Sequence, residues 1–412
     1  MMRFLFILAL VTSLAIILYG RTLEYGFDLD DYHQVRPYTM AEVGGSFRGP
    51  WDPTGIEAPF YRPLTVALFA VRFHVFGFDA RRYHWASILA FSLAAILLGV
   101  FLLRVSGSLR VASTGALLFT VHPAMPYSLV AWAANQPHLI QLSIFLLALL
   151  WWVVCRDRST VWWIPLIPLE AIAFLLKEDG IMLLICVLLI HTVYGWTLAD
   201  RRIVQPARWF YVASGLTILG LMVLRHAALG ELGGYRLHGW QSAVSNELRG
   251  PYHVLVHGGH RLRVLAAEGG LINTLFVTGT TAAGMWIAAR NKRWGLARFC
   301  ISMGLVIMGT FNIPYLFQTK VYQWHFLALG GVLVLLGSIE AVYNVLESVS
   351  LRLGFVVLLL GAVLNMGRVT RAIAEDFSPY SPNTLAHDAQ VLSWGDRVPP
   401  ELRRVILQKR DQ

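Results

Sequence analysis

Three aspartates stand close together near the start of the chain, in the segment FDLDDYHQ (27–34): Asp28, Asp30 and Asp31. A carboxylate can accept the proton of a hydroxyl group, and carboxylate oxygens are also the ligands that Mg²⁺ prefers. Neighbouring side chains on a helix or strand point in different directions. Asp30 and Asp31 therefore predict a division of roles, in which one contacts a substrate and the other orients it or faces a metal. Taken alone, a solvated acidic turn explains the three residues adequately.

The composition is that of a membrane protein. Of the 412 residues, 56% are hydrophobic and 14% are charged, and the mean hydropathy is +0.57, whereas soluble domains are about 45–50% apolar and about 25% charged. The formal net charge of +10 does not argue for nucleic acid, because much of it lies in short connectors between apolar segments. The three cysteines are scattered without a CxxC pair, which indicates neither a disulfide framework nor a cysteine metal site.

Apolar segments predict an all-α polytopic membrane protein with about eleven transmembrane helices, since a spanning helix needs about 20 mostly apolar residues. The first segment is expected to be a retained span rather than a cleaved signal peptide, because no small-x-small site follows it. The candidate spans are 4–20, 84–104, 110–122, 138–154, 161–176, 180–196, 209–225, 271–289, 299–313, 324–340 and 351–367. The segment between the third and fourth spans is expected to form a non-helical elbow.

Basic connectors set the expected orientation. If the spans alternate, all the short basic connectors fall on one face, and the positive-inside rule makes that face cytoplasmic. These connectors are the one with Arg104 and Arg110, the one with Arg156 and Arg158, and two more later in the chain. The opposite face carries a first outer loop at 21–83 and a second at 226–270. We therefore expect a transmembrane domain over 1–367, a short extracytoplasmic tail over 368–412, and a location in the inner or plasma membrane, facing the periplasm or exterior.

Polar motifs collect on the predicted outer face. Residues 61–77 begin with a proline suited to a first helical turn and read as an amphipathic helix lying at the membrane interface. An active site at the outer membrane boundary would produce this one-sided pattern. The motifs are FDLDD, FYRPLTVALF (60–69), FGFDARRYH (76–84), HPAMPYSLVAWAANQPH (122–138), LKED (176–179) and FQTKVYQWH (317–325).

The order of these motifs resembles that of the glycosyltransferase-C superfamily of polyprenyl-phosphate-sugar-dependent membrane enzymes. Within it, the protein O-mannosyltransferase-like group is most similar, including the enzymes whose membrane part is followed by tetratricopeptide repeats. The resemblance covers roughly residues 20–195 well and 310–340 loosely. No single motif is specific, and the order together with the shared outer placement is moderately so. The matching segments are FDLDD, YRPLT, FGFDARRYH, LFTVHPAMPYSLVAW, LLKED and TKVYQWHFLALG.

The resemblance implies a mannosyltransferase-like hexosyltransferase that moves a sugar from a polyprenyl-phosphate-linked donor to a hydroxyl acceptor, with inversion. The acceptor is a protein, a glycan or a lipid. Asp30 takes the position of the catalytic base, and Asp31 that of its supporting or metal-facing partner. No cofactor is established, and a divalent cation (Mg²⁺ or Mn²⁺) at Asp31 stays open. The donor phosphate is expected at Arg62 and Lys177, with Arg82 behind them. Substrate contacts are expected at Tyr61, His122, His138 and Glu178.

Two departures from the family pattern qualify this expectation. Relatives commonly carry Arg-Lys-Asp after the VAW motif, whereas this chain has NQPH (135–138), so His138 or Asn135 replaces that polar contact or the contact is lost. No tetratricopeptide array follows the bundle, so acceptor recognition is expected in loop 226–270. The histidines of that loop are read as an interfacial polar segment rather than as a metal site.

Two other classes of protein stay open. A transporter or flippase for lipid-linked glycans would share the apolar bundle, but it predicts functional charges near the bilayer midplane and visible repeated halves. A glycan polymerase or ligase would use outer-loop arginines and a histidine instead of a first-loop acidic pair, which loop 226–270 allows.

Overall fold

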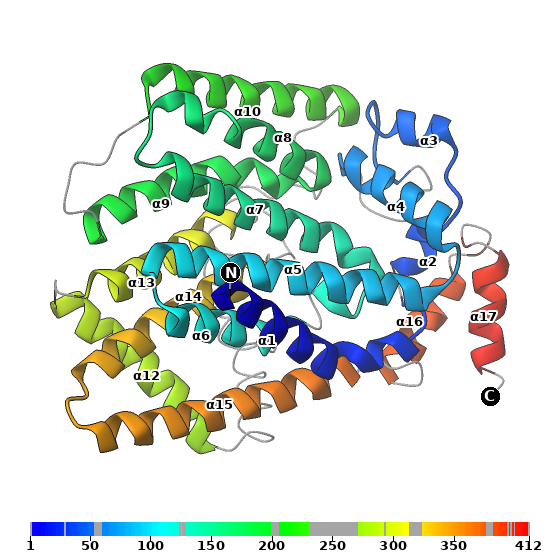
Figure 1. Ribbon diagram of the computed structural model, residues 1–412. Coiled ribbons are helices and arrows are strands. Elements are labelled where there is room, and N and C mark those ends of the chain that lie inside the picture. Colours follow the sequence, from blue (N-terminus) through cyan, green and yellow to red (C-terminus); the bar gives the residue numbers. More distant parts are fainter. Residues whose placement is uncertain are drawn as a thin grey trace, which may run out of the picture.

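The computed structural model is all-α, with no strand in the part of the chain that it describes (Figure 1). The described residues are 2–28, 30–52, 60–122, 125, 129–198, 206–230, 271–291, 294–312, 324–375, 382–393, 395, 398 and 400–410. Most of the second outer loop, with its histidines, lies outside these ranges. The predicted class, an all-α polytopic membrane protein, is confirmed.

Each of the eleven predicted spans coincides with a helix. Seven helices of the described chain are long and apolar enough to cross a membrane singly, and α12 and α13 qualify together as a pair bent by 117°. Helices α6 and α8 are shorter apolar helices. The helices are α1 (Met2–Tyr19), α5 (Ala80–Ser106), α6 (Leu109–Thr120), α7 (Gln136–Cys155), α8 (Leu166–Leu176), α9 (Leu183–Thr197), α10 (Arg208–Leu229), α12 (Leu271–Arg290), α13 (Gly295–Asn312), α14 (Trp324–Val345) and α15 (Val349–Glu375).

Helix α14 lies in the centre of the bundle. In its candidate span 78% of the residues are buried, against 17% in those of α10 and α15, which expose leucine and valine side chains as lipid-facing helices do. Helices α13 and α14 approach closely because both carry glycine at their contact: a Cβ on Gly304 would lie 2.4 Å from the carbonyl oxygen of Gly330. Small residues at such contacts are a common means of packing membrane helices, since they let the backbones touch.

Five further helices gather at one end of the bundle, which we call the capped end (Figure 1). Pro63 occupies the first turn of α4, where its missing N–H costs no hydrogen bond, and α4 covers most of the amphipathic segment predicted at 61–77. The last two of the five lie in the segment expected to form the C-terminal tail. The five are α2 (Asp31–Gln34), α3 (Met40–Gly45), α4 (Pro63–Phe76), α16 (Pro382–Ser393) and α17 (Pro400–Arg410).

The predicted elbow separates α6 from α7. Helix α6 ends at Thr120, and α7 begins at Gln136 with Pro137 in its first turn. A short 3-10 turn, η3 (Ala133–Asn135), leads directly into α7, while residues 123–124 and 126–128 lie outside the described residues. The first N–H groups of a helix have no partner within it, so the turn that leads into α7 offers donors to side chains of the first loop, as Ala134 does to Asp31.

Candidate active site at the capped end

The turn between α8 and α9 presents the LKED motif. Helix α8 ends at Leu176, Lys177 adopts an extended backbone (φ −160°, ψ 138°), and the 3-10 turn η5 (Glu178–Met182) folds back against α8. Gly180 makes this possible, because a Cβ at that position would lie 2.2 Å from the carbonyl carbon of Ala173. The side chains of Lys177 and Glu178 are therefore held at the end of the bundle by a backbone contact that only glycine permits.

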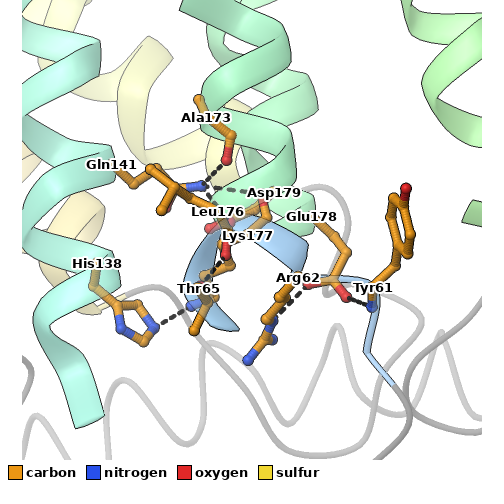
Figure 2. Close-up of polar contacts among 10 residues, drawn as sticks. All are labelled: Tyr61, Arg62, Thr65, His138, Gln141, Ala173, Leu176, Lys177, Glu178 and Asp179. Carbon is orange, nitrogen blue, oxygen red and sulfur yellow. Dashed lines mark hydrogen bonds and ion pairs between the residues drawn. The ribbon is translucent and has the colours of Figure 1, made fainter. Parts of the chain in front are cut away.

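Side chains from two other helices fix the same turn (Figure 2). Gln141 of α7 is 1% exposed, and its amide nitrogen donates to the side chain of Asp179 at 2.8 Å and to the carbonyl of Lys177 at 3.2 Å. Thr65 of α4 donates its hydroxyl to the carbonyl of Leu176 at 2.7 Å. The first outer loop, α7 and the α8–α9 turn thus meet at one place.

Lys177 contacts His138 of α7 through its ammonium group (Figure 2). Lys177 is only 4% exposed, and this burial lowers its pKa to about 7, so the side chain can hold or lose a proton near neutral pH. The ring of His325, at the start of α14, lies 5.2 Å from that of His138, centroid to centroid. The buried Nε2 of His325 has no hydrogen-bond partner among the described residues. We call Lys177, His138 and His325 the basic cluster.

Glu178 binds the YRP segment of the first loop (Figure 2). One carboxylate oxygen accepts from Nε of Arg62 and the other from the backbone N–H of Tyr61, both at 2.9 Å. The guanidinium of Arg62 also stacks 3.8 Å from the ring centre of Phe60. Arg62 is thereby held rigidly beside the turn that carries Lys177. The Tyr61 hydroxyl points elsewhere, donating to the carbonyl of Phe47 at 3.2 Å.

Asp31 ties the first loop to the elbow. It is completely buried, and its two oxygens accept from the backbone N–H of Ala134 at 2.6 Å and from that of Asp28 at 3.1 Å. Burial raises the pKa of Asp31 to about 8, although both N–H donors favour its charged form. Since Ala134 precedes His138 by one helical turn, Asp31 links the acidic motif to the basic cluster.

The other two aspartates differ in exposure. Asp28 is 5% exposed and accepts from the indole N–H of Trp132 at 2.9 Å and from Nδ1 of His387 at 3.0 Å. Asp30 precedes α2 and is partly exposed. Two buried carboxylates therefore anchor the motif, and the one between them in sequence, Asp30, remains partly exposed.

The donor groups around Asp31 do not fit a divalent cation in this arrangement. Both of its oxygens already accept from backbone N–H groups. Within the described residues, no three or more His, Cys, Asp or Glu side chains are grouped so that they would hold a metal ion. We therefore assign no step of the chemistry to a metal.

Two further predicted residues, Arg82 and His122, make local contacts. Arg82 pairs with Asp79 at 2.9 Å on an exposed surface, with 59% and 45% of the two side chains accessible, and donates to the carbonyl of Val75 at 3.3 Å. His122 follows α6, and its backbone bonds to Phe119 and Met125 are local. The structure brings together Tyr61, Arg62, His138, Lys177 and Glu178, whereas Arg82 binds Asp79 and Val75.

Several residues of the site were not expected. Gln141 carries a visible signal, as a polar side chain within a predicted span, and His325 ends the FQTKVYQWH motif. The contacts of Asp28 were not predicted either, because its partners Trp132 and His387 lie 104 and 359 positions away along the chain. No local pattern indicates contacts over such separations.

Comparisons with known proteins show a likeness in structure alone. No protein-family model matches the chain, and no curated protein sequence does. The crystal structure of the Archaeoglobus fulgidus oligosaccharyltransferase in complex with Zn and sulfate has a TM-score of 0.53 and 15% identity, covering 94% of this chain and 55% of that one. The archaeal oligosaccharyltransferase AglB from A. fulgidus, in complex with an inhibitory peptide and a dolichol-phosphate, has a TM-score of 0.56 and 12% identity, covering 98% and 59%.

A third structure, ArnT from Cupriavidus metallidurans in the apo state, has a TM-score of 0.46 and 14% identity, covering 90% of this chain and 76% of that one. The chain spans less than two thirds of the length of the two oligosaccharyltransferases. The narrower likeness to protein O-mannosyltransferases stays a prediction. The likeness to the two oligosaccharyltransferases is therefore one of fold, over the part of each that this chain covers.

Proposed function

We propose that this chain is an integral membrane glycosyltransferase, which moves a sugar from a polyprenyl-phosphate-linked donor to a hydroxyl acceptor at the capped end of the bundle. The observation that supports it is the meeting of two clusters there: the basic cluster with Arg62, and the acidic motif. Asp31 joins them through Ala134. By the positive-inside rule this end faces the periplasm or exterior.

The basic cluster suits the donor phosphate. A lipid phosphate is an adequate leaving group, but the charge it gains as the glycosidic bond breaks must be stabilised by fixed donors. Arg62 is held by Glu178, and Lys177 is held by the turn around Gly180. The unpartnered Nε2 of His325 is a further group that a phosphate oxygen would satisfy.

The acidic motif suits the acceptor. In the proposed step Asp30 accepts the proton of the acceptor hydroxyl, while the oxygen of that hydroxyl bonds to the anomeric carbon of the donor sugar. The bond from that carbon to the phosphate oxygen breaks, with inversion, and polyprenyl phosphate leaves with the electron pair. Asp28 and Asp31 hold the loop so that Asp30 meets the acceptor in one geometry.

The other two classes of protein have less support. A transporter would place its functional charges at the middle of the bundle, whereas both clusters lie at the capped end. A polymerase or ligase would depend on residues 231–270, which lie outside the described residues.

The decisive experiment is Asp30→Asn in purified protein, assayed with polyprenyl-phosphate-linked mannose, glucose, galactose and an aminosugar. Loss of a catalytic base should lower the transfer rate by roughly 10²–10⁴-fold, while donor binding persists because the basic cluster is intact. Asp79→Asn, on the exposed surface, is the matched control. Undiminished transfer by Asp30→Asn would refute the assignment of the base.

A further inference from the structure

The C-terminal helices α16 and α17 pack over the first-loop acidic motif. Figure 1 shows both of them at the capped end, beside α2. A separate apolar cluster joins them to the first loop, α5 and the elbow, and every member is buried. These members are Phe27, Tyr32, Val35, Tyr83, Ala133, Val391, Val398, Leu402 and Ile406. The tail is therefore docked on the candidate active site rather than held apart from it.

Two adjacent residues of α16 reach the motif with polar groups. His387 lies with Nδ1 at 3.0 and 3.1 Å from the two carboxylate oxygens of Asp28. Asp388 accepts from the hydroxyl of Tyr32 at 3.3 Å. The His387 ring also lies 6.3 Å from that of Trp132, the other side-chain donor to Asp28. The tail thus supplies one of the two side-chain N–H groups that satisfy this carboxylate.

The acidic motif needs such donors. Carboxyl groups this close disfavour one another's charge, and the side chains of Asp28 and Asp31 are nearly or completely buried. A buried carboxylate that loses a hydrogen-bond donor is strongly disfavoured. Asp28 would respond by turning toward water. Its backbone N–H, which now donates to Asp31 at 3.1 Å, would move with it.

We propose that His387 is a positioning residue for the transfer reaction. Through Asp28 it holds the acidic motif in the conformation that presents Asp30, so the C-terminal helices form part of the active site. This inference rests on the proposed function for its kinetic readout. The structural part of the proposal is that the tail orders the first loop, and this can be measured without any sugar donor.

Substitutions at position 387 separate positioning from packing. His387→Ala removes the donor to Asp28, and kcat should fall about tenfold or more, as for loss of a charge-assisted hydrogen bond. The KM for the donor should stay within about twofold, because the substitution leaves the basic cluster, where the donor binds, unchanged. His387→Asn places an amide nitrogen near the position of Nδ1 and should restore most of the rate, whereas His387→Gln places it farther out and should not.

Tyr32→Phe is the matched control. It removes a second hydrogen bond between the tail and the first loop while leaving Asp28, His387 and the apolar cluster in place. Its kcat should stay within about twofold of wild type, since Asp28 keeps both of its side-chain donors, Trp132 and His387. Equal losses in Tyr32→Phe and His387→Ala would show that the tail acts only as a cover, and would overturn the proposal.

Hydrogen exchange of the amides in residues 25–35 gives the second readout. Exchange should speed up in His387→Ala and His387→Gln, and should return toward wild type in His387→Asn. Unchanged exchange in His387→Ala, or equal behaviour of the Asn and Gln variants, would overturn the proposal. If His387→Ala does not fold, the comparison of the Asn and Gln variants decides. If wild type transfers no sugar from any donor, the proposed function fails and the exchange result still tests the positioning.

Discussion

Substitution of Lys177 tests the assignment of the basic cluster to the donor phosphate. Lys177 is buried against His138, and burial lowers its pKa to about 7. The nearest opposite charges are Asp179 and Glu178, while Arg62 disfavours its protonation. A phosphate favours the charged lysine, so the donor should bind more tightly below the pKa and more weakly above it. Lys177→Met should remove this dependence on pH.

The magnitude follows from the pKa of about 7. If the charged lysine alone binds, the apparent Kd scales as one plus the ratio of neutral to charged lysine, and between roughly pH 6 and pH 9 it rises about 90-fold. The ligand should be a phosphodiester donor, which keeps one negative charge over this range. The monoester product is unsuitable, because it gains a second charge near pH 6 or so.

The assay is donor binding to protein in nanodiscs at several pH values, for wild type, Lys177→Met and Lys177→Arg. Wild type should lose affinity above about pH 7, Lys177→Met should be weak throughout, and Lys177→Arg should stay tight at high pH because arginine keeps its charge. An unchanged pH profile in Lys177→Met would refute the reasoning.

The stability of the protein without donor should rise with pH, whereas its affinity for the donor falls. The pKa of Lys177 is about 7 in the folded protein and 10.5 for an ordinary lysine in water, so the unfolded state binds more protons between these values and stability rises with pH.

Three further substitutions test the supports of the site. Gly180→Ala should push η5 away from α8, destabilise the protein by about 1–3 kcal/mol in thermal unfolding and weaken donor binding, since the added methyl overlaps the backbone; wild-type stability would contradict the close packing of this turn. Asp31→Asn leaves one acceptor oxygen for two N–H groups, so unfolding measured with denaturant should show a loss of about 1–3 kcal/mol, and no loss would refute the anchoring role. Glu178→Gln keeps a carbonyl oxygen for Tyr61 but removes the charge that holds Arg62, so the donor KM should rise roughly tenfold with a smaller change in kcat; an unchanged KM would separate Arg62 from the donor.

The sequence predicted the helices because lipid imposes a simple rule. A segment in the hydrocarbon layer must bond its own backbone and cover it with apolar side chains, so hydropathy alone locates a helix. All eleven predicted spans are helices in the structure, and the proline at 63 starts α4 as expected. The start of α8 was less predictable: the predicted span begins at 161, whereas α8 begins at Leu166, after a 3-10 turn at Thr160–Trp163.

The candidate site was predictable in part. The order of the motifs and their shared place on the predicted outer face pointed to four residues that the structure brings to one place: Arg62, Lys177, Glu178 and His138. Sidedness also pointed to Arg82, yet its contacts lie on an exposed helix start. A motif says which face a residue occupies, but on that face the distance between two residues depends on how the helices pack.

The acidic motif at 27–34 shows most clearly what could be predicted from the sequence and what depends on the packing of the helices. Its residue types and its place after the first span were enough to predict carboxylate chemistry at one membrane face. Which aspartate is buried was decided by the elbow and by the C-terminal helix α16, whose His387 lies 359 positions from Asp28. Apolar periodicity and charge patterns are local and can be read along the chain. Hydrogen bonds between distant segments arise only when the whole bundle has packed, because packing sets which carboxylate is buried against a donor and which stays partly exposed.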